Sequence, residues 1–271
     1  MIAKIKVARE KKNVLIASHR GCSGGNVIQN TIPAFENALL QGADILEMDV
    51  IRSTDGKYFL FHTDQEPALL GTSQRLNTLD SGQILSFSLH NCIHYPTRQK
   101  VNRLDDVLEQ FKGRCLINID RSWGFFEELI PHLDRFQMQD QIILKGHSSP
   151  KETEVMQSIG SKYMYMPIVS RQEDVDRAFP LNCRVIGMEM VFQEENSSLL
   201  QEANIRKAHD RGWILWANSI NLDDTRKLGG GHDDRVSMFR DPDDGWGWLV
   251  RHGFDVIQTD WPMLLSCYLR K

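Results

Sequence analysis

The stretch that decides the fold runs from residue 14 to residue 62 and contains VLIASHRG at 14–21, DILEMDV at 44–50 and DGKYFLFH at 55–62. Each segment holds a short apolar run of a length typical of a buried strand. Between the first two segments, Thr31 is a good helix N-cap and Pro33 suits a first helical turn. We therefore predict a strand, a helix, a second strand and a hairpin return.

Two carboxylates lie two residues apart in the second of these strands. Because side chains alternate across a strand, Glu47 and Asp49 point to the same side. Neighbouring carboxylates repel each other, so a proton, a cationic side chain or a metal ion must neutralise them. With oxygen ligands alone, the metal would be Mg²⁺, Ca²⁺ or Mn²⁺. His19 and His62 follow the first strand and the hairpin return, and histidines near such a pair suit general acid and base catalysis.

The rest of the chain alternates between short apolar runs and helical patterns. Further strands are predicted to end near Asp120, Lys145, Pro167, Glu189, Asn218 and Asp260. Helices are predicted at about 103–111, 125–136, from Pro150, and at about 173–179, 198–211 and 246–252. Eight parallel strands separated by helices are typical of an α/β protein with a closed (β/α)₈ barrel, the TIM barrel; an open doubly wound sheet is the alternative. The polar strand ends favour the barrel, because there they converge on one mouth.

Residues 63–100 break this alternation, because Gly and Pro interrupt them and no long period runs through them. We predict a small insertion after the second strand, either a cap on the barrel rim or a segment that sets substrate specificity. Residues 1–12 are predicted as a charged lead-in or short helix. The acidic, glycine-rich stretches at 229–234 and 241–245 are predicted as solvated loops or a mobile lid. The whole chain, 1–271, is then predicted as one barrel domain.

Composition restricts the classes of function. The chain has 271 residues, of which 41% are hydrophobic and 25% charged, as in an ordinary globular protein. Its net charge of -4 argues against a nucleic-acid binder, and a small-molecule substrate is expected instead. No run approaches the ~18 apolar residues of a membrane helix, and no secretion signal is visible. Five scattered cysteines without a Cys-x-x-Cys motif argue for thiols in a reducing cytoplasm.

Several short motifs, in order and spacing, resemble the glycerophosphodiester phosphodiesterase family. They are His19-Arg20-Gly21, Asn30-Thr31, Gly42-Ala43-Asp44, Glu47-x-Asp49, Thr54-Asp55-Gly56, His62 and the closing stretch from Gly253 to Pro262. The resemblance covers nearly the whole chain and is weaker at about 63–110 and 150–205. It implies the same barrel and a metal-dependent hydrolysis of glycerophosphodiesters to glycerol 3-phosphate and an alcohol.

The resemblance also implies roles for individual residues. His19 and His62 match the catalytic pair of the family. Glu47 and Asp49 match two ligands of one divalent metal ion, Mg²⁺ or Ca²⁺ or alternatively Mn²⁺. Asp120 stands where the family places its third acidic ligand, which is usually Glu. These five residues form the predicted catalytic and metal-binding set.

Cationic and aromatic side chains complete the predicted site. Arg20 would bind the phosphodiester oxygens with its planar guanidinium, with a structural salt bridge as the alternative. Lys145 could replace a lysine of the family whose position holds Ser122 here; its alternative is pairing with Glu189. Glu189 itself could support the site or hydrogen-bond the substrate. Trp216 could form a wall of the pocket or belong to the core.

Gln29 is the most informative departure from the family, which carries a glutamate just before the Asn-Thr pair. A glutamine keeps the size but loses the charge, so a weakened or inactive enzyme is one alternative. Asn30 belongs to the same predicted pocket. Two other functions remain open on this barrel, a phospholipase D-like lipid phosphodiesterase and a non-catalytic phosphodiester-binding protein. An exposed apolar rim in 63–100 would favour the lipid enzyme.

Overall fold

The computed structural model describes residue 5, residues 12–159 and residues 162–270. The predicted lead-in at 1–12 therefore lies, apart from Ile5 and Lys12, outside the described residues. The five cysteines, all described, form no disulfide, as predicted. No helix among the described residues has the length and apolarity that a membrane crossing needs.

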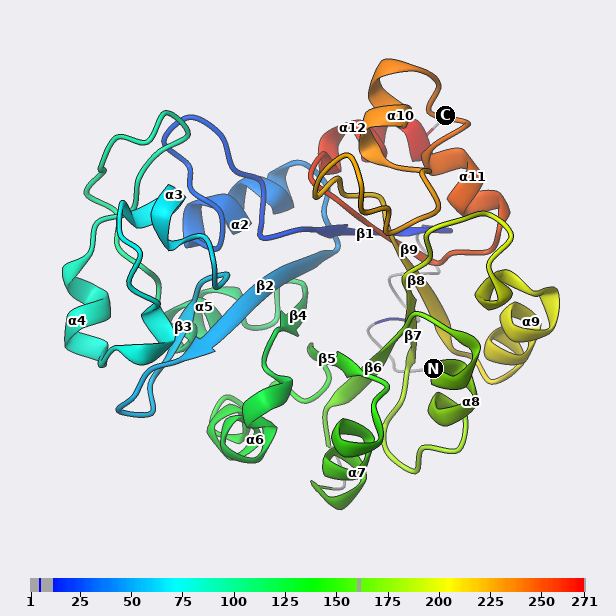
Figure 1. Ribbon diagram of the computed structural model, residues 1–271, viewed down its shortest axis with the longest axis horizontal. Helices are drawn as coiled ribbons and strands as arrows, with labels where there is room; N and C mark the ends of the chain where they lie inside the picture. The colour runs from blue at the N-terminus through cyan, green and yellow to red at the C-terminus, as the bar shows by residue number, and fades with distance from the viewer. Residues whose placement is uncertain (1–4, 6–11, 160–161, 271) are drawn as a thin grey trace.

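Eight parallel strands form a closed ring, into which Figure 1 looks, with helices outside it. They are β1 (Leu15–Ser18), β2 (Ile45–Arg52), β4 (Leu116–Asp120), β5 (Ile142–His147), β6 (Met164–Val169), β7 (Gly187–Met190), β8 (Ile214–Asn218) and β9 (Val256–Thr259). The strands follow the order β1-β9-β8-β7-β6-β5-β4-β2, and pairing of β1 with β2 closes the ring. The predicted (β/α)₈ barrel is confirmed, and the open doubly wound sheet is wrong. The hairpin return is β3 (Tyr58–Leu60), antiparallel to β2.

The helices around the ring follow the predicted alternation with small shifts in their ends. They are α2 (Ile32–Leu40), α5 (Leu104–Phe111), α6 (Phe126–Asp134), α7 (Pro150–Ile159), α8 (Gln172–Ala178), α9 (Glu202–Asp210), α10 (Asp234–Phe239), α11 (Trp246–Arg251) and α12 (Pro262–Leu269). Single 3₁₀ turns are η1 (Leu76–Thr78), η2 (Trp123–Phe125) and η3 (Ser198–Leu200). The helix predicted at 198–211 is divided into η3 and α9, and α10 and α12 were not predicted. Thr31 caps α2 as predicted, because its hydroxyl accepts from the backbone of Ala34.

The inside of the barrel is apolar at one end and polar at the other. Ile45 on β2 belongs to the apolar cluster inside the ring, together with Leu15 on β1 and Leu116 on β4. Because side chains alternate, Glu47 and Asp49 on β2 point to the same side as Ile45, one and two steps nearer the carboxyl end. The alternation thus carries the two carboxylates into the mouth of the barrel.

The predicted insertion packs as a small unit beside the mouth, at the left of Figure 1. It contains α3 (Glu66–Leu70), η1 and α4 (Ser81–Ser86). Leu70, Leu76 and Ile84 of this unit pack with Phe59 and Phe61 in a separate buried cluster. The insertion therefore has an apolar core of its own, although its sequence shows no long hydrophobic period.

The prediction of solvated loops at 229–234 and 241–245 is wrong for part of this region. His232 and Asp234 are buried, with 8% and 2% of their surface exposed. Asp234 begins α10, and its carboxylate accepts hydrogen bonds from Ser219, Thr259 and the indole of Trp246. Acidic composition suggested solvent exposure, whereas these donors compensate the burial of the carboxylate.

The close contact between β7 and β8 predicts that a methyl group added at Gly187 destabilises the fold. A Cβ on Gly187 would lie 2.0 Å from the carbonyl oxygen of Ile214 on β8, so the strands must separate to admit it. Gly187→Ala should lower the free energy of unfolding by at least about 2 kcal/mol in a denaturant titration. Among the described residues, nothing lies within 4 Å of a Cβ built on Gly124, so Gly124→Ala should change it by less than about 0.5 kcal/mol. Equal effects of the two substitutions would contradict this packing.

Candidate active site at the barrel mouth

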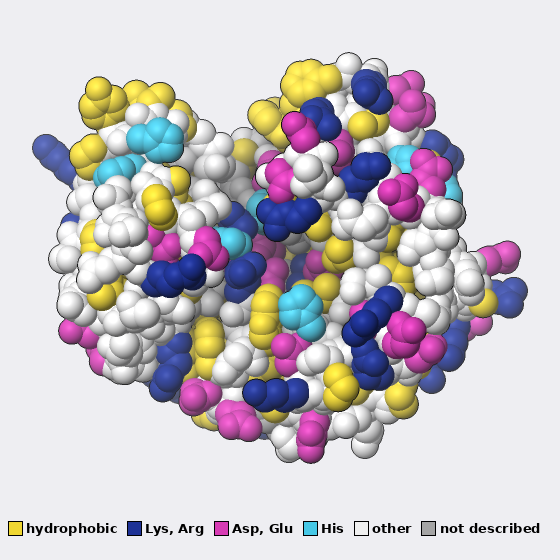
Figure 2. All heavy atoms as spheres, in the orientation of Figure 1, with side chains coloured by type: hydrophobic (Ala, Val, Ile, Leu, Met, Phe, Trp, Pro, Cys, Tyr) yellow, Lys and Arg dark blue, Asp and Glu magenta, His cyan; other side chains and the backbone are white. Residues whose placement is uncertain are grey.

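The polar strand ends predicted from the sequence meet at the carboxyl end of the barrel. Asp49 on β2 lies in register with Asp120 on β4, so the two carboxylates leave neighbouring strands side by side. Figure 2 shows a hollow between the insertion and the lobe of α10–α12, with acidic and basic side chains in its floor. A cavity of about 600 Å³ is lined by residues of both lobes, including His19, Arg20 and Gln29.

Arg20 connects the two carboxylates of β2. Its backbone N–H donates to Glu47 Oε2 at 2.8 Å, and its Nε forms an ion pair with Asp49 Oδ2 at 2.8 Å. Asn30 Nδ2 donates to the same oxygen at 2.9 Å, while the backbone N–H of Asp49 donates to Asn30 Oδ1 at 3.1 Å. The salt bridge named as the alternative for Arg20 is therefore present, and Asn30 supports Asp49 and does not line the cavity.

Gln29, the departure from the family, contacts Arg20 directly. Its Oε1 accepts from Arg20 Nη1 at 3.1 Å, and both residues line the cavity. Nε and Nη1 of Arg20 thus have protein partners, which fixes the plane of the guanidinium. A glutamate at this position would add a negative charge beside Arg20, so the glutamine leaves the guanidinium less neutralised.

The buried carboxylates are not fully compensated by these partners. Burial, and next the charge of Asp49, raise the pKa of Glu47 to about 8. Burial also raises the pKa of Asp120; the charge of Lys145 acts in the opposite direction, and the smaller effect of the Glu189 charge offsets part of it. Burial acts in the same direction on Asp49, but Arg20 and His62 outweigh it and hold the pKa of Asp49 below its ordinary value. The floor of the mouth therefore favours an additional positive charge.

The donor atoms of this floor fit a divalent cation in type, since all are carboxylate oxygens. Their present arrangement is not a formed metal site. Among the described residues, no three His, Cys, Asp or Glu side chains converge closely enough to hold a metal ion. Asp49 is turned toward Arg20 and Asn30, and Asp120 Oδ1 accepts from the backbone of Arg121 at 2.7 Å. Coordination by Glu47, Asp49 and Asp120 together would require their side chains to turn.

His19 is held by a carboxylate that comes from the last strand of the barrel. Its Nδ1 lies 2.8 Å from Asp260 Oδ1. Burial alone would lower the pKa of His19, but the hydrogen bond and charge of Asp260 outweigh it, so that the pKa is raised. The sequence analysis named Asp260 only as a strand end. Its pairing with His19 follows from the closure of the barrel, in which β9 lies next to β1. Ser18 of β1 is in register with Thr259 of β9, so the next residues on the two strands are neighbours.

His62 lies near the same centre but in a different environment. Its Nδ1 lies 2.5 Å from the carbonyl oxygen of Thr63, which makes Nδ1 the donor and leaves Nε2 to accept a proton. Burial lowers the pKa of His62 despite the nearby charge of Asp49, and the charge of Arg20 acts in the same direction as burial. Both histidines act electrostatically on Asp49, and the two pKa values are displaced in opposite directions.

Lys145 lies inside β5 and faces the interior of the barrel. Its Nζ forms an ion pair with Glu189 Oε2 at 2.6 Å, and it donates to Gln258 Oε1 at 3.2 Å. It also lies 3.6 Å from the ring centroid of Trp216, which is fully buried. Lys145 is therefore paired with Glu189, and Trp216 belongs to the core. Both were the alternatives named in the sequence analysis. Asn218 Nδ2 donates to Glu189 Oε1, so Glu189 supports this interior network.

A residue that the sequence analysis missed fixes the segment that carries Asp260. Asp234 Oδ2 accepts from the backbone N–H of Asp260 at 2.9 Å, in addition to its bonds from Ser219, Thr259 and Trp246. Burial raises the pKa of Asp234 to about 6. No local pattern marks this residue, because its four donors come from three separate parts of the chain.

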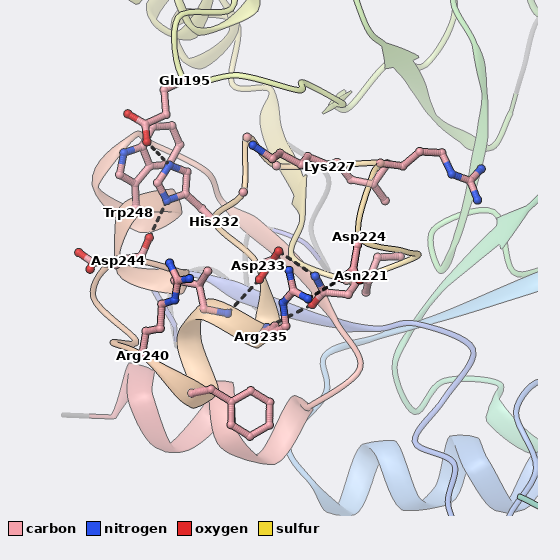
Figure 3. A pocket seen from close by; sticks show the side chains of 18 of the residues that line it. Glu195, Asn221, Asp224, Lys227, His232, Asp233, Arg235, Arg240, Asp244 and Trp248 are labelled. Atoms are coloured by element: carbon pink, nitrogen blue, oxygen red, sulfur yellow. Dashed lines mark hydrogen bonds and ion pairs between the residues drawn. The ribbon is translucent and has the colours of Figure 1, made fainter.

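A larger cavity, of about 930 Å³, adjoins the mouth and is shown in Figure 3. Several of its charged side chains are paired with each other: Arg235 with Asp224 at 2.6 Å, Arg226 with Asp223 at 2.7 Å and His232 with Glu195 at 3.1 Å. His232 stacks on Trp248 with ring centroids 3.8 Å apart. His19 lines the smaller cavity and not this one, and His62 lines neither, so we assign the chemistry to the smaller cavity.

Comparison with known sequences supports the resemblance. A family model described only as a domain of unknown function matches residues 165–269. The chain is 31% identical over 106 residues to lysophospholipase D GDPD3 of Mus musculus, covering 36% of this chain and 32% of that protein. It is 27% identical over 140 residues to a glycerophosphodiester phosphodiesterase of Bacillus altitudinis, covering 48% of this chain and 57% of that protein. The chain thus matches a third to a little over half of the length of these relatives.

Solved structures show the same fold. A glycerophosphoryl diester phosphodiesterase from Parabacteroides distasonis matches with a TM-score of 0.76 and 18% identity, covering 100% of this chain and 93% of that one. A phosphodiesterase from Oleispira antarctica, solved in complex with sn-glycerol-3-phosphate, matches with a TM-score of 0.69 and 16% identity, covering 97% and 99%. The protein is a (β/α)₈ barrel with a polar site at its mouth. Its predicted resemblance to the glycerophosphodiester phosphodiesterase family is confirmed.

Proposed function

We propose that the protein is a phosphodiesterase that hydrolyses glycerophosphodiesters to glycerol 3-phosphate and an alcohol, with a divalent metal ion. The observation that carries the proposal is the pairing of His19 with Asp260 in the cavity that Arg20 lines, together with a second histidine, His62, that the charges of Asp49 and Arg20 reach. The relatives named as glycerophosphodiester phosphodiesterases, and the related fold solved with sn-glycerol-3-phosphate, support it.

The two histidines divide the proton transfers between them. His62 enters neutral and removes the proton from the nucleophile as that oxygen bonds to phosphorus. The nucleophile is a water, or a neighbouring hydroxyl of the substrate, in which case a water opens the resulting cyclic phosphodiester in a second step. His19 enters protonated, because Asp260 stabilises its cation, and gives its proton to the alkoxide as the bond between phosphorus and the leaving oxygen breaks. The directions of the two pKa displacements agree with these roles.

Positive charge for the phosphoryl oxygens comes first from Arg20. Its guanidinium lines the cavity, and its contacts with Asp49 and Gln29 hold it in one plane. The N–H groups that point to the cavity are suited to two phosphoryl oxygens at once. We keep Lys145 as a second, interior source of positive charge, which would act on the phosphoryl group only if Glu189 releases it.

Glu47, Asp49 and Asp120 are the residues that would hold the metal ion, either Mg²⁺ or Ca²⁺, with Mn²⁺ as a third choice. When bound, a divalent ion supplies charge stabilisation for a phosphoryl oxygen. The raised pKa of Glu47 supports this assignment, because a cation would favour the ionised carboxylate that burial and Asp49 disfavour.

A second candidate is a lipid phosphodiesterase on the same barrel. Ile93 and Tyr95, in the insertion, are 65% and 67% exposed, and such an apolar rim suits a lipid surface. The relative from Mus musculus carries the name lysophospholipase D. Faster hydrolysis of lysophosphatidylcholine than of any soluble glycerophosphodiester would favour this candidate.

The proposed function predicts a metal-dependent release of glycerol 3-phosphate. Soluble glycerophosphodiesters should be hydrolysed, with the activity lost in EDTA and regained with one of Mg²⁺, Ca²⁺ or Mn²⁺. His19→Ala and His62→Ala should each lower kcat by at least ~10²-fold, because each removes one proton transfer. His94→Ala, at an exposed histidine of the insertion, is the matched control and should keep normal turnover. No release of glycerol 3-phosphate under any metal, or near-normal turnover in both alanine variants, would contradict the proposal.

The division of roles predicts the pH dependence of kcat/KM. The rate should fall at acid pH when His62, with a pKa below the ordinary 6.5, becomes protonated. It should fall at alkaline pH when His19, with a pKa above 6.5, loses its proton. Asp260→Asn removes the charge that favours the cation of His19, so the alkaline limb should move to lower pH while the acid limb stays. An unmoved alkaline limb would show that His19 is not the acid.

A further inference from the structure

The cavity beside His19 and Arg20 has a lining that is polar but carries little charge. Its charged lining residues among those described are His19, Arg20 and Asp260, which belong to the proposed catalytic site. The remaining polar lining consists mainly of neutral side chains: Ser23, Gln29, Asn37, Gln41, Gln65 and Asn221. At about 600 Å³, the space is within the usual range for a small-molecule site.

The amides reach the cavity from different elements and are partly fixed by one another. On α2, Gln41 Nε2 donates to Asn37 Oδ1 at 3.1 Å, and Asn37 Nδ2 donates to the carbonyl oxygen of Cys22 at 2.9 Å. Asn221, which follows β8, donates to Asp233 at 2.7 Å. These contacts set the orientation of the amides before any ligand is present.

Gln65 differs from the other amides because one of its polar atoms lacks a partner. Its Oε1 is buried and accepts no hydrogen bond from the described residues. A buried amide oxygen without a donor is unfavourable by roughly 1–3 kcal/mol, and a hydroxyl group of a ligand would relieve this once the side chain of Gln65 turns Oε1 into the cavity that it lines. Gln65 precedes α3 of the insertion, so the insertion contributes one of the amides that line the cavity.

We propose that this cavity binds the alcohol half of the phosphodiester, and that this alcohol is neutral and carries several hydroxyl groups, as a sugar or cyclitol does. The inference rests on the proposed function and names its substrate class. Amide side chains both donate and accept, which matches hydroxyl groups. The half-exposed indole of Trp261 adds a flat apolar face for the C–H groups of a ring.

A cationic alcohol such as choline fits this lining less well. Its ammonium group would be expected to meet an unpaired carboxylate or a cage of several aromatic rings. Asp260 is the carboxylate among the described lining residues, and it is already paired with His19. Trp261 is the aromatic residue among them. The neutral polyol is therefore the better match.

Kinetic selectivity tests the inference. The wild-type protein should show kcat/KM at least about tenfold higher for glycerophosphoinositol than for glycerophosphocholine. Gln65→Leu removes the amide at similar volume and should lower that ratio about fivefold or more, because one hydrogen bond to the polyol is lost. Gln157→Leu, at an exposed position of α7, is the matched control and should keep the ratio. Equal kcat/KM for the two esters, or a ratio unchanged in Gln65→Leu, would overturn the inference.

A binding measurement separates failure of this inference from failure of the proposed function. Calorimetric titration in EDTA, with the same two esters, needs no turnover. Binding of glycerophosphoinositol at least about tenfold tighter than glycerophosphocholine, weakened in Gln65→Leu, supports the inference even if neither ester is hydrolysed. In that case only the proposed hydrolysis is contradicted. Equal affinities, or tighter binding of the choline ester, overturn the inference whether or not both esters are hydrolysed.

Discussion

The mouth of this barrel depends on the burial of two carboxyl groups on one face of one strand. Glu47 and Asp49 are 1% and 2% exposed, and the pleat of β2 prevents either from turning to the other side of the sheet. Arg20 satisfies both, by its backbone and its side chain, and Asn30 holds Asp49 from a second direction. Arg20 and Asn30 both adopt left-handed backbone conformations, with φ of +55° and +57°. The loop after β1 is therefore shaped around the carboxylates, and it brings His19 with it.

Closure of the barrel then determines the environment of His19, the first of the two histidines proposed for catalysis. Pairing of β1 with β9 places Asp260 beside His19 and stabilises its cation. Asp234 fixes the backbone of Asp260, so α10 and the loop before it contribute to the site without lining it. His62 donates to the backbone carbonyl of Thr63 and has no carboxylate as a hydrogen-bond partner among the residues that the structure describes. The fold thus raises the pKa of His19 and lowers the pKa of His62. Acid–base catalysis at one pH requires such a difference between the acid and the base.

Local patterns in the sequence were sufficient for the strands, for most helices and for the shared side of Glu47 and Asp49. Period and capping are properties of a few neighbouring residues, so they can be read without the fold. The pairing of Lys145 with Glu189 was one of two alternatives named from the sequence, but the partners of His19 and Asp234 could not be read in this way. Each pairing joins elements far apart in the sequence and depends on barrel register or on loop packing. Of these, the pairing of His19 with Asp260 was accessible from barrel closure, while the burial of Asp234 in an acidic stretch was not.

The central claim is that the carboxylates of Glu47 and Asp49 on β2 and of Asp120 on β4 together bind one divalent cation. The most direct measurement is a calorimetric titration of the metal-free protein with Mn²⁺, Mg²⁺ and Ca²⁺, repeated with Glu47→Gln and Asp120→Asn. The account predicts one ion per chain in the unmodified protein, with affinity lowered at least about tenfold in each variant, since each loses a charged ligand. Absence of binding for all three ions, or an affinity in both variants equal to that of the unmodified protein, would contradict it.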